Sequence, residues 1–130
     1  MKKIKIVVSL FAISFIFSVT GVNAAYHSFI GITIPSMSGT YTSDSVYKNT
    51  ISNQTVKKNG AKDNLSGDER AIQSRLNGIG ASYIDVATSY RTLANNGSLG
   101  QIPGDYKIEF KAKKWTASSV TFSGSWILDN

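Results

Sequence analysis

The sequence contains no cysteine, only two prolines and a single histidine in 130 residues. The absence of cysteine excludes disulfide bonds and thiolate metal sites, so the folded chain must be held together by its own core. With one histidine, His27, the sequence has no histidine-based catalytic triad and no set of zinc ligands. We expect His27 to be a mobile residue close to the start of the folded chain and not a general base.

The first 24 residues have the three-part composition of a secretory signal peptide. Lys2, Lys3 and Lys5 form a basic start, an almost wholly apolar run follows at residues 6–19, and Val22-Asn23-Ala24 supplies small residues for a signal peptidase. The apolar run is shorter than the roughly 20 residues that cross a bilayer as a helix. The sequence therefore predicts cleavage after Ala24 and a secreted protein without a transmembrane segment; the alternative is an uncleaved N-terminal anchor.

The remaining residues, 25–130, are enough for one domain and too few for two. Three of the 14 basic residues lie in the first 24 positions, whereas all eight acidic residues lie beyond them, so the formal charge falls from +6 to +3. A mildly basic, exported chain is expected to meet anionic cell-envelope polymers, glycans or membrane surfaces, but +3 is too small for nucleic-acid binding. Export without cysteine also favours a bacterial source.

Alternating apolar and polar residues predict strands near the C-terminus. Between residues 106 and 113 the even positions are apolar and the odd positions are charged, as in a strand with one buried face. Between residues 120 and 128 the even positions, including Trp126, again form an apolar face that we expect to enter the core. We predict that these two strands pair as an antiparallel hairpin around a loop at residues 115–118.

Further strands are expected where Ile, Thr, Tyr and Val are enriched, at residues 30–34, 39–47, 51–58 and 83–92. In the first of these, Ile30, Ile32 and Ile34 alternate with smaller residues. Residues 66–78 combine a helix-capping pattern with a strand-like stretch at 71–76, and we favour the strand. About seven strands predict an all-β domain, an antiparallel two-sheet β-sandwich of the immunoglobulin-like or jelly-roll-like kind.

A lysine-rich stretch beside a tryptophan is the leading candidate for a binding surface. It consists of Lys107, Lys111, Lys113, Lys114 and Trp115. Lysines at alternate positions of a strand project from one face and could bind an anionic polymer, although lysines also simply keep a sheet face soluble. A tryptophan outside the alternating pattern could stack on a sugar or enter a membrane interface, or it could fold over the open end of the sandwich.

The acidic residues offer two weaker sites. Asp63, Asp68 and Glu69 lie in an oxygen-rich stretch that could hold calcium, but Leu65 falls at a ligand position and the spacing does not fit an EF-hand loop. A hydrolase built on carboxylates alone would need two of them facing each other across a cleft. We expect all eight to lie in turns or on solvent-facing strand positions: Asp44, Asp63, Asp68, Glu69, Asp85, Asp105, Glu109 and Asp129.

The sequence thus predicts a small secreted β-sandwich protein that needs no cofactor, is not an enzyme, and acts by surface contact with cell-envelope or extracellular polymer. The alternative is a secreted bacteriocin or toxin-like antagonist, and a carboxylate-only hydrolase is the third interpretation.

Overall fold

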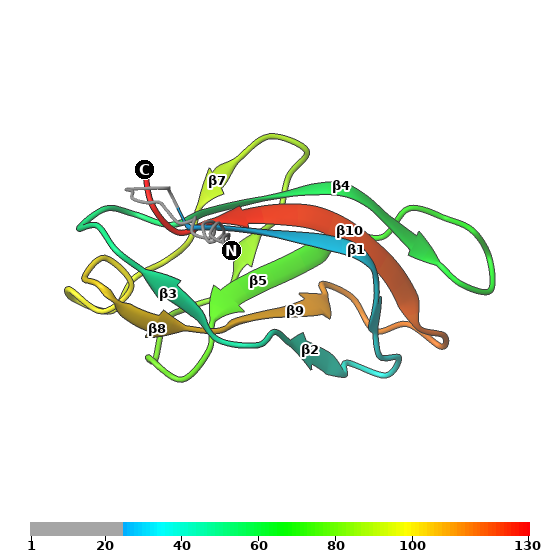
Figure 1. The fold of residues 1–130 in the computed structure, drawn as a ribbon. Coiled ribbons are helices and arrows are strands. Elements are labelled where there is room, and N and C mark those ends of the chain that lie inside the picture. Colours follow the sequence, from blue (N-terminus) through cyan, green and yellow to red (C-terminus); the bar gives the residue numbers. More distant parts are fainter. Residues whose placement is uncertain (1–24) are drawn as a thin grey trace, which may run out of the picture.

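The computed structural model describes residues 25–130, so the predicted signal peptide lies outside the described residues. This part of the chain forms ten strands and no helix (Figure 1). The strands are β1 (Tyr26–Ile34), β2 (Thr40–Thr42), β3 (Val46–Lys48), β4 (Thr55–Asp63), β5 (Ile72–Leu76), β6 (Ile84–Asp85), β7 (Arg91–Thr92), β8 (Gly104–Tyr106), β9 (Ile108–Ala112) and β10 (Val120–Ile127). Accordingly, no helix long and apolar enough to cross a membrane occurs in residues 25–130.

The strands form two four-stranded antiparallel sheets and one short pair. The first sheet has the order β1-β10-β4-β7, and the second has the order β2-β9-β5-β6. The pair β3-β8 continues the second sheet along the chain, because β3 follows β2 and β8 precedes β9. The prediction of an all-β, antiparallel domain is confirmed, with ten strands in place of about seven.

The difference in strand number comes from three predicted strands that the structure divides. Residues 39–47 form β2 and β3, and residues 83–92 form β6 and β7, which belong to different sheets. The predicted strand at residues 106–113 is divided between β8, which ends at Tyr106, and β9, which begins at Ile108. Composition identifies extended segments but does not show where the backbone leaves one sheet for the other. Residues 72–76 are the strand β5, as we favoured.

The predicted hairpin near the C-terminus is wrong. β9 pairs with β2 and β5, whereas β10 pairs with β1 and β4 in the opposite sheet. The connecting residues cross from one sheet to the other. The alternation is unaffected, because strands that face one core from opposite sides need the same pattern as strands that lie side by side.

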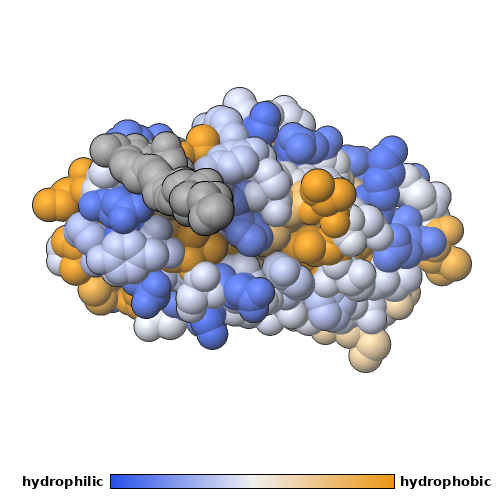
Figure 2. Space-filling model, viewed as in Figure 1, coloured by the Kyte–Doolittle hydropathy of each residue, from blue (hydrophilic) through white to orange (hydrophobic). Residues whose placement is uncertain are grey.

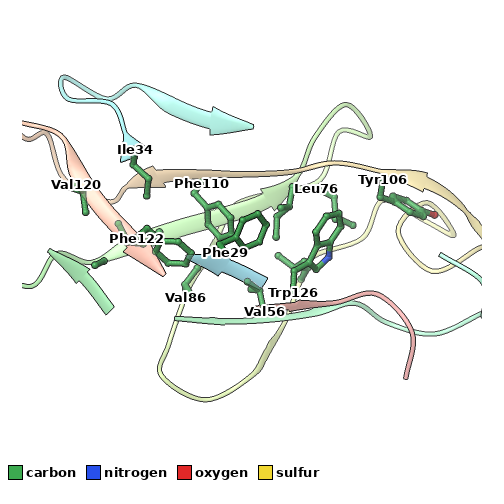
Figure 3. Close-up of a cluster of buried hydrophobic side chains, with 14 of the residues drawn as sticks. Phe29, Ile34, Val56, Leu76, Val86, Tyr106, Phe110, Val120, Phe122 and Trp126 are labelled. Atoms are coloured by element: carbon green, nitrogen blue, oxygen red, sulfur yellow. The ribbon is translucent and has the colours of Figure 1, made fainter. Parts of the chain in front are cut away.

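One apolar core lies between the two sheets (Figure 3). Phe110 of the second sheet packs with its ring centroid 5.1 Å from Phe29 and 4.5 Å from Phe122, both of the first sheet. Trp126 is fully buried, as predicted, and its indole nitrogen donates to the Gln54 side-chain oxygen at 2.8 Å. This bond satisfies a polar group that burial would otherwise leave without a partner, and so keeps the tryptophan in the core.

A bulge in β1 changes which isoleucines are buried. Between Phe29 and Ile32 the register with β10 shifts by one residue, and Gly31 takes a left-handed conformation with φ of 62°. Such a bulge reverses the direction of the side chains that follow. Phe29 and Ile34 are therefore buried, whereas Ile30 is 88% exposed.

His27 lies in β1 and is half-buried. Its ring centroid is 4.6 Å from that of Phe29 and 6.5 Å from that of Trp126. The expectation of a mobile residue is wrong, because strand pairing with β10 orders the chain from Tyr26 onward.

Candidate functional site

Three loops meet at the end of the molecule remote from both described chain termini (Figure 1). They are residues 35–39, 63–71 and 113–119, and we call this end the loop end. The third loop is bonded to the first, because the Met37 amide donates to the Thr116 carbonyl at 2.9 Å. This hydrogen bond holds the first and third loops in a fixed position relative to each other.

Asp63 fixes the second loop to the third. Its carboxylate accepts hydrogen bonds from the Leu65 and Ser66 amides at 2.9 and 3.0 Å and from the Ser118 hydroxyl at 2.6 Å. The Arg70 guanidinium forms an ion pair with the same carboxylate at 2.9 Å. The Ser118 hydroxyl and the Ser66 and Leu65 amides hold the pKa of Asp63 well below its usual value.

The predicted calcium ligands are not brought together as a metal site. Glu69 accepts a hydrogen bond from the Ala61 amide at 2.9 Å and forms an ion pair with the Lys58 ammonium at 3.3 Å, and Asp68 is exposed. Within residues 25–130, no group of three or more histidine or carboxylate side chains is placed to hold a metal ion. The oxygen atoms of Asp63 and Glu69 are instead used to order the loop.

A pocket of about 310 Å³ lies beside Trp115 at the loop end. It is lined by Glu69, Arg70, Ala71, Ala112, Lys114, Trp115 and Thr116. Trp115 is 65% exposed, so it does not cover the end of the core. Thr116 is only 6% exposed, yet its hydroxyl has no hydrogen-bond partner among the described residues. A buried hydroxyl without a partner is costly, and because its oxygen has almost no exposed surface it is not a contact for a ligand in the pocket.

The five candidate binding residues divide between two surfaces. Lys114 and Trp115 line the pocket. Lys111 and Lys113 belong to the outer side of the second sheet, where the Lys111 ammonium lies 4.3 Å from the Tyr83 ring centroid. Lys113 forms an ion pair with Asp85 at 2.8 Å, and Lys107 is exposed just before β9. The lysines therefore do not form one uninterrupted cationic stripe.

Tyr83 and Glu109 form a polar cluster between these lysines, and this cluster has no signature in the sequence. The Tyr83 hydroxyl donates to the Glu109 carboxylate at 2.5 Å, and the Arg75 guanidinium contacts both residues. Burial alone would raise the pKa of Glu109, but hydrogen bonds from Tyr83, Asn77 and Arg75 outweigh it and leave that pKa below its usual value. The segment before β6 covers Glu109, so the alternation that predicted an exposed position is overridden by a distant residue.

Three carboxylates are buried, although we expected all eight to lie in turns or on solvent-facing strand positions. Asp63, Glu109 and Asp129 are each less than a tenth exposed. Each is paired with a cation, Asp63 with Arg70, Glu109 with Arg75 and Asp129 with Lys48, and each has a pKa below its usual value. Burial of an acid requires such partners, and composition does not show which acids will find them.

Comparison with known proteins found no matching protein family, no matching curated protein and no matching solved structure. The residues of the loop end are therefore the basis for a functional assignment.

Proposed function

We propose that residues 25–130 form a secreted, non-catalytic binding domain that holds an acidic polymer of the cell envelope or extracellular space in the pocket beside Trp115. The observation that carries this proposal is the combination of an exposed indole, that of Trp115, and an exposed lysine without an ion-pair partner among the described residues, Lys114, in one concave site. An indole offers a flat apolar face for a sugar ring, and a lysine ammonium group offers hydrogen bonds together with a positive charge.

Charge at the pocket favours an acidic ligand. Arg70 and Glu69, which also line the pocket, are already paired with Asp63 and Lys58. Lys114 forms no ion pair with a described carboxylate, so its ammonium is available to a carboxylate or phosphate on the polymer. The net charge of +3 on residues 25–130 would assist the approach of such a polymer.

The surface also fits contact with a polar polymer. On the face shown in Figure 2, hydrophobic residues form separate patches among hydrophilic ones and not one continuous apolar surface. Large continuous apolar patches are the usual mark of an extensive membrane or protein interface.

The buried carboxylates support a non-catalytic role. A glycosidase-type general acid needs a raised pKa so that it keeps its proton until it donates it. Asp63, Glu109 and Asp129 all have lowered pKa values, so each is held ionised by its partners. Their role is to order loops and strands.

The fold that we infer is a jelly roll. Neighbouring strands in each sheet come from distant parts of the chain, and the chain passes repeatedly between the two sheets. Counting β3 and β8 as continuations of β2 and β9 leaves eight strands, the number in a jelly roll. Lectin domains use this architecture, which is an analogy at the level of the fold only.

Co-sedimentation of the secreted protein with isolated cell envelopes tests the proposed binding. We expect Trp115→Ala and Lys114→Gln each to weaken binding about tenfold, equivalent to about 1.4 kcal/mol. Raising the salt concentration should weaken wild-type binding and have less effect on Lys114→Gln. Leu65→Ala and Lys62→Gln are matched controls, because both residues are exposed near the pocket and neither lines it.

Equal binding by Trp115→Ala and Leu65→Ala would contradict the pocket assignment. Binding to vesicles of anionic lipid but not to envelope polymer would replace the polymer by a membrane. Growth inhibition of other bacteria by the purified protein, without envelope binding, would instead favour an antagonistic protein.

A further inference from the structure

A buried ion pair lies at the end of the molecule opposite the pocket. Lys48 and Asp129 are 0% and 3% exposed, and the Lys48 ammonium is 3.6 Å from Oδ1 of Asp129. The ammonium also donates to the Ser52 hydroxyl at 2.7 Å and to the Leu128 carbonyl. Burial lowers the pKa of Lys48, and the attraction of Asp129 opposes that effect.

The carboxylate of Asp129 accepts hydrogen bonds on both of its oxygens. The backbone amides of Asn49 and Thr50 and the Thr50 hydroxyl donate to Oδ1 at 2.9 to 3.0 Å. The second oxygen, Oδ2, accepts from the backbone nitrogen of Ala25 at 2.9 Å. The Leu128 amide donates to the Ala25 carbonyl at 3.0 Å, so Ala25 is held from two sides.

The residue that meets this carboxylate is the one that follows the predicted cleavage site. We propose that the Ala24–Ala25 bond is the processing site and that the α-ammonium group released at Ala25 binds Asp129 as a second, partly buried ion pair. This inference rests on the proposed export of the protein. A peptidase would add water across the bond, leaving a carboxylate on Ala24 and an amine on Ala25 that takes up a proton at neutral pH.

Cleavage changes the chemistry of the contact without moving the chain. Before it, the Ala25 nitrogen is an amide with one hydrogen and no formal charge; afterwards, it carries a positive charge and three hydrogens. One hydrogen can remain on Oδ2, and because Ala25 is only half-buried the others can reach water. Charge-assisted hydrogen bonds are about twice as strong as neutral ones, so the processed chain is expected to be more stable.

The two oxygens of Asp129 allow the carboxylate to serve two cations. Lys48 approaches Oδ1, whereas Ala25 approaches Oδ2. The amide donors from Asn49 and Thr50 fix the orientation of the carboxylate between them. The Asp129 carboxylate is therefore already oriented to bind the α-ammonium group before cleavage creates that group.

The test uses the full chain in a secreting host, with Gly-Ser inserted directly after Ala24. Cleavage after Ala24 then gives a product in which the Ala25 nitrogen is still an amide. The matched control carries Gly-Ser after Asn130, where it adds the same bulk and leaves the α-ammonium intact. Mass spectrometry identifies the first residue of each product, and thermal unfolding gives the midpoint temperature.

We expect the unmodified product to begin at Ala25. The variant with the N-terminal insertion should have a midpoint temperature of unfolding about 4–8 °C lower than that of the control with the C-terminal insertion. In the Asp129→Asn background the insertion should have no effect. If that variant does not fold, selective acetylation of the Ala25 amine tests the charge alone and should also lower the midpoint. A different first residue, or equal midpoints with and without acetylation, would overturn the proposal; neither outcome bears on polymer binding.

Discussion

At the scale of single residues, Tyr83 shows how one side chain organises the outer surface of the second sheet. Two cations contact its ring, with the Arg75 guanidinium 4.5 Å and the Lys111 ammonium 4.3 Å from the ring centroid. Its hydroxyl donates to Glu109, which would otherwise be a buried carboxylate with fewer donors. Tyr83 thus links Arg75 of β5 with Glu109 and Lys111 of β9.

Tyr83 is expected to ionise at unusually high pH. Burial and the hydrogen bond to Glu109 raise its pKa to about 12, above the usual value of about 10. The folded state then holds this proton more tightly than the unfolded chain, so the stability that Tyr83 contributes is present below pH 10 and is lost as the pH rises towards 12. Ultraviolet titration of the phenolate should show one late step.

Tyr83→Phe should remove that late step and leave the other tyrosine steps in place. Tyr47→Phe is the matched control, since Tyr47 is exposed, and should keep the late step. A late step that survives in Tyr83→Phe would show that another tyrosine is responsible.

At the scale of elements, β10 is an inner strand of the first sheet with an irregularity on each side. Its pairing with β1 shifts at Gly31, and its pairing with β4 shifts between Ser123 and Gly124. Two bulges at the same level bend the sheet, and a glycine in β10 allows the backbones to come close there.

Gly124→Ala is expected to destabilise the protein by about 1–3 kcal/mol. A methyl group at this position would lie 2.3 Å from the Lys57 carbonyl oxygen and 2.8 Å from the Phe122 ring, and the first of these atoms is backbone that cannot rotate away. Urea unfolding measures the loss. Gly60→Ala is the control on the neighbouring strand: no atom lies within 4 Å of the added methyl, so the change should stay within about 0.5 kcal/mol. Equal losses would disprove the steric explanation.

A comparison of the predicted strands with the observed ones shows how far the sequence could predict this structure. Alternation correctly predicted that Ile108, Phe110, Phe122 and Trp126 are buried, because it records which face of a strand meets the core. It does not record which strand lies alongside, and the hairpin prediction failed for that reason. At the candidate site, Trp115 could be identified because it lies outside the alternation. Arg70, which also lines the pocket, comes from a different loop that no local sequence pattern connects to Trp115.

At the scale of the whole molecule, a buried carboxylate stabilises each end. Asp63 orders the loop end, and Asp129 joins the first and last described parts of the chain. For Asp129, burial alone would raise the pKa, but hydrogen bonds from Ala25, Thr50 and Asn49 outweigh it and hold the pKa below the usual value. Acid is therefore expected to destabilise both ends over the same pH range.

Stability is expected to be nearly constant from pH 7 to about 5 and to fall as the pH drops below about 4. Because the pKa values of Asp63 and Asp129 are lowered by folding, the unfolded chain binds more protons in acid, and protonation favours unfolding. Urea unfolding at several pH values tests this. Asp129→Asn should be less stable at pH 7 and less sensitive to acid, whereas Asp44→Asn, at an exposed position, should keep the wild-type acid response. Stability that does not change between pH 5 and 2 would contradict the assignment.

The bulge in β1 has a consequence for the protein in concentrated solution. β1 is an edge strand of its sheet, so one side of its backbone is unpaired within residues 25–130. A regular strand of nine residues would offer a second molecule a long template for intermolecular pairing. The bulge at Ile30 and Gly31 divides that template into two short runs and twists them out of line. The backbone distortion that exposes Ile30 thereby protects the protein against polymerisation through its own β-strand.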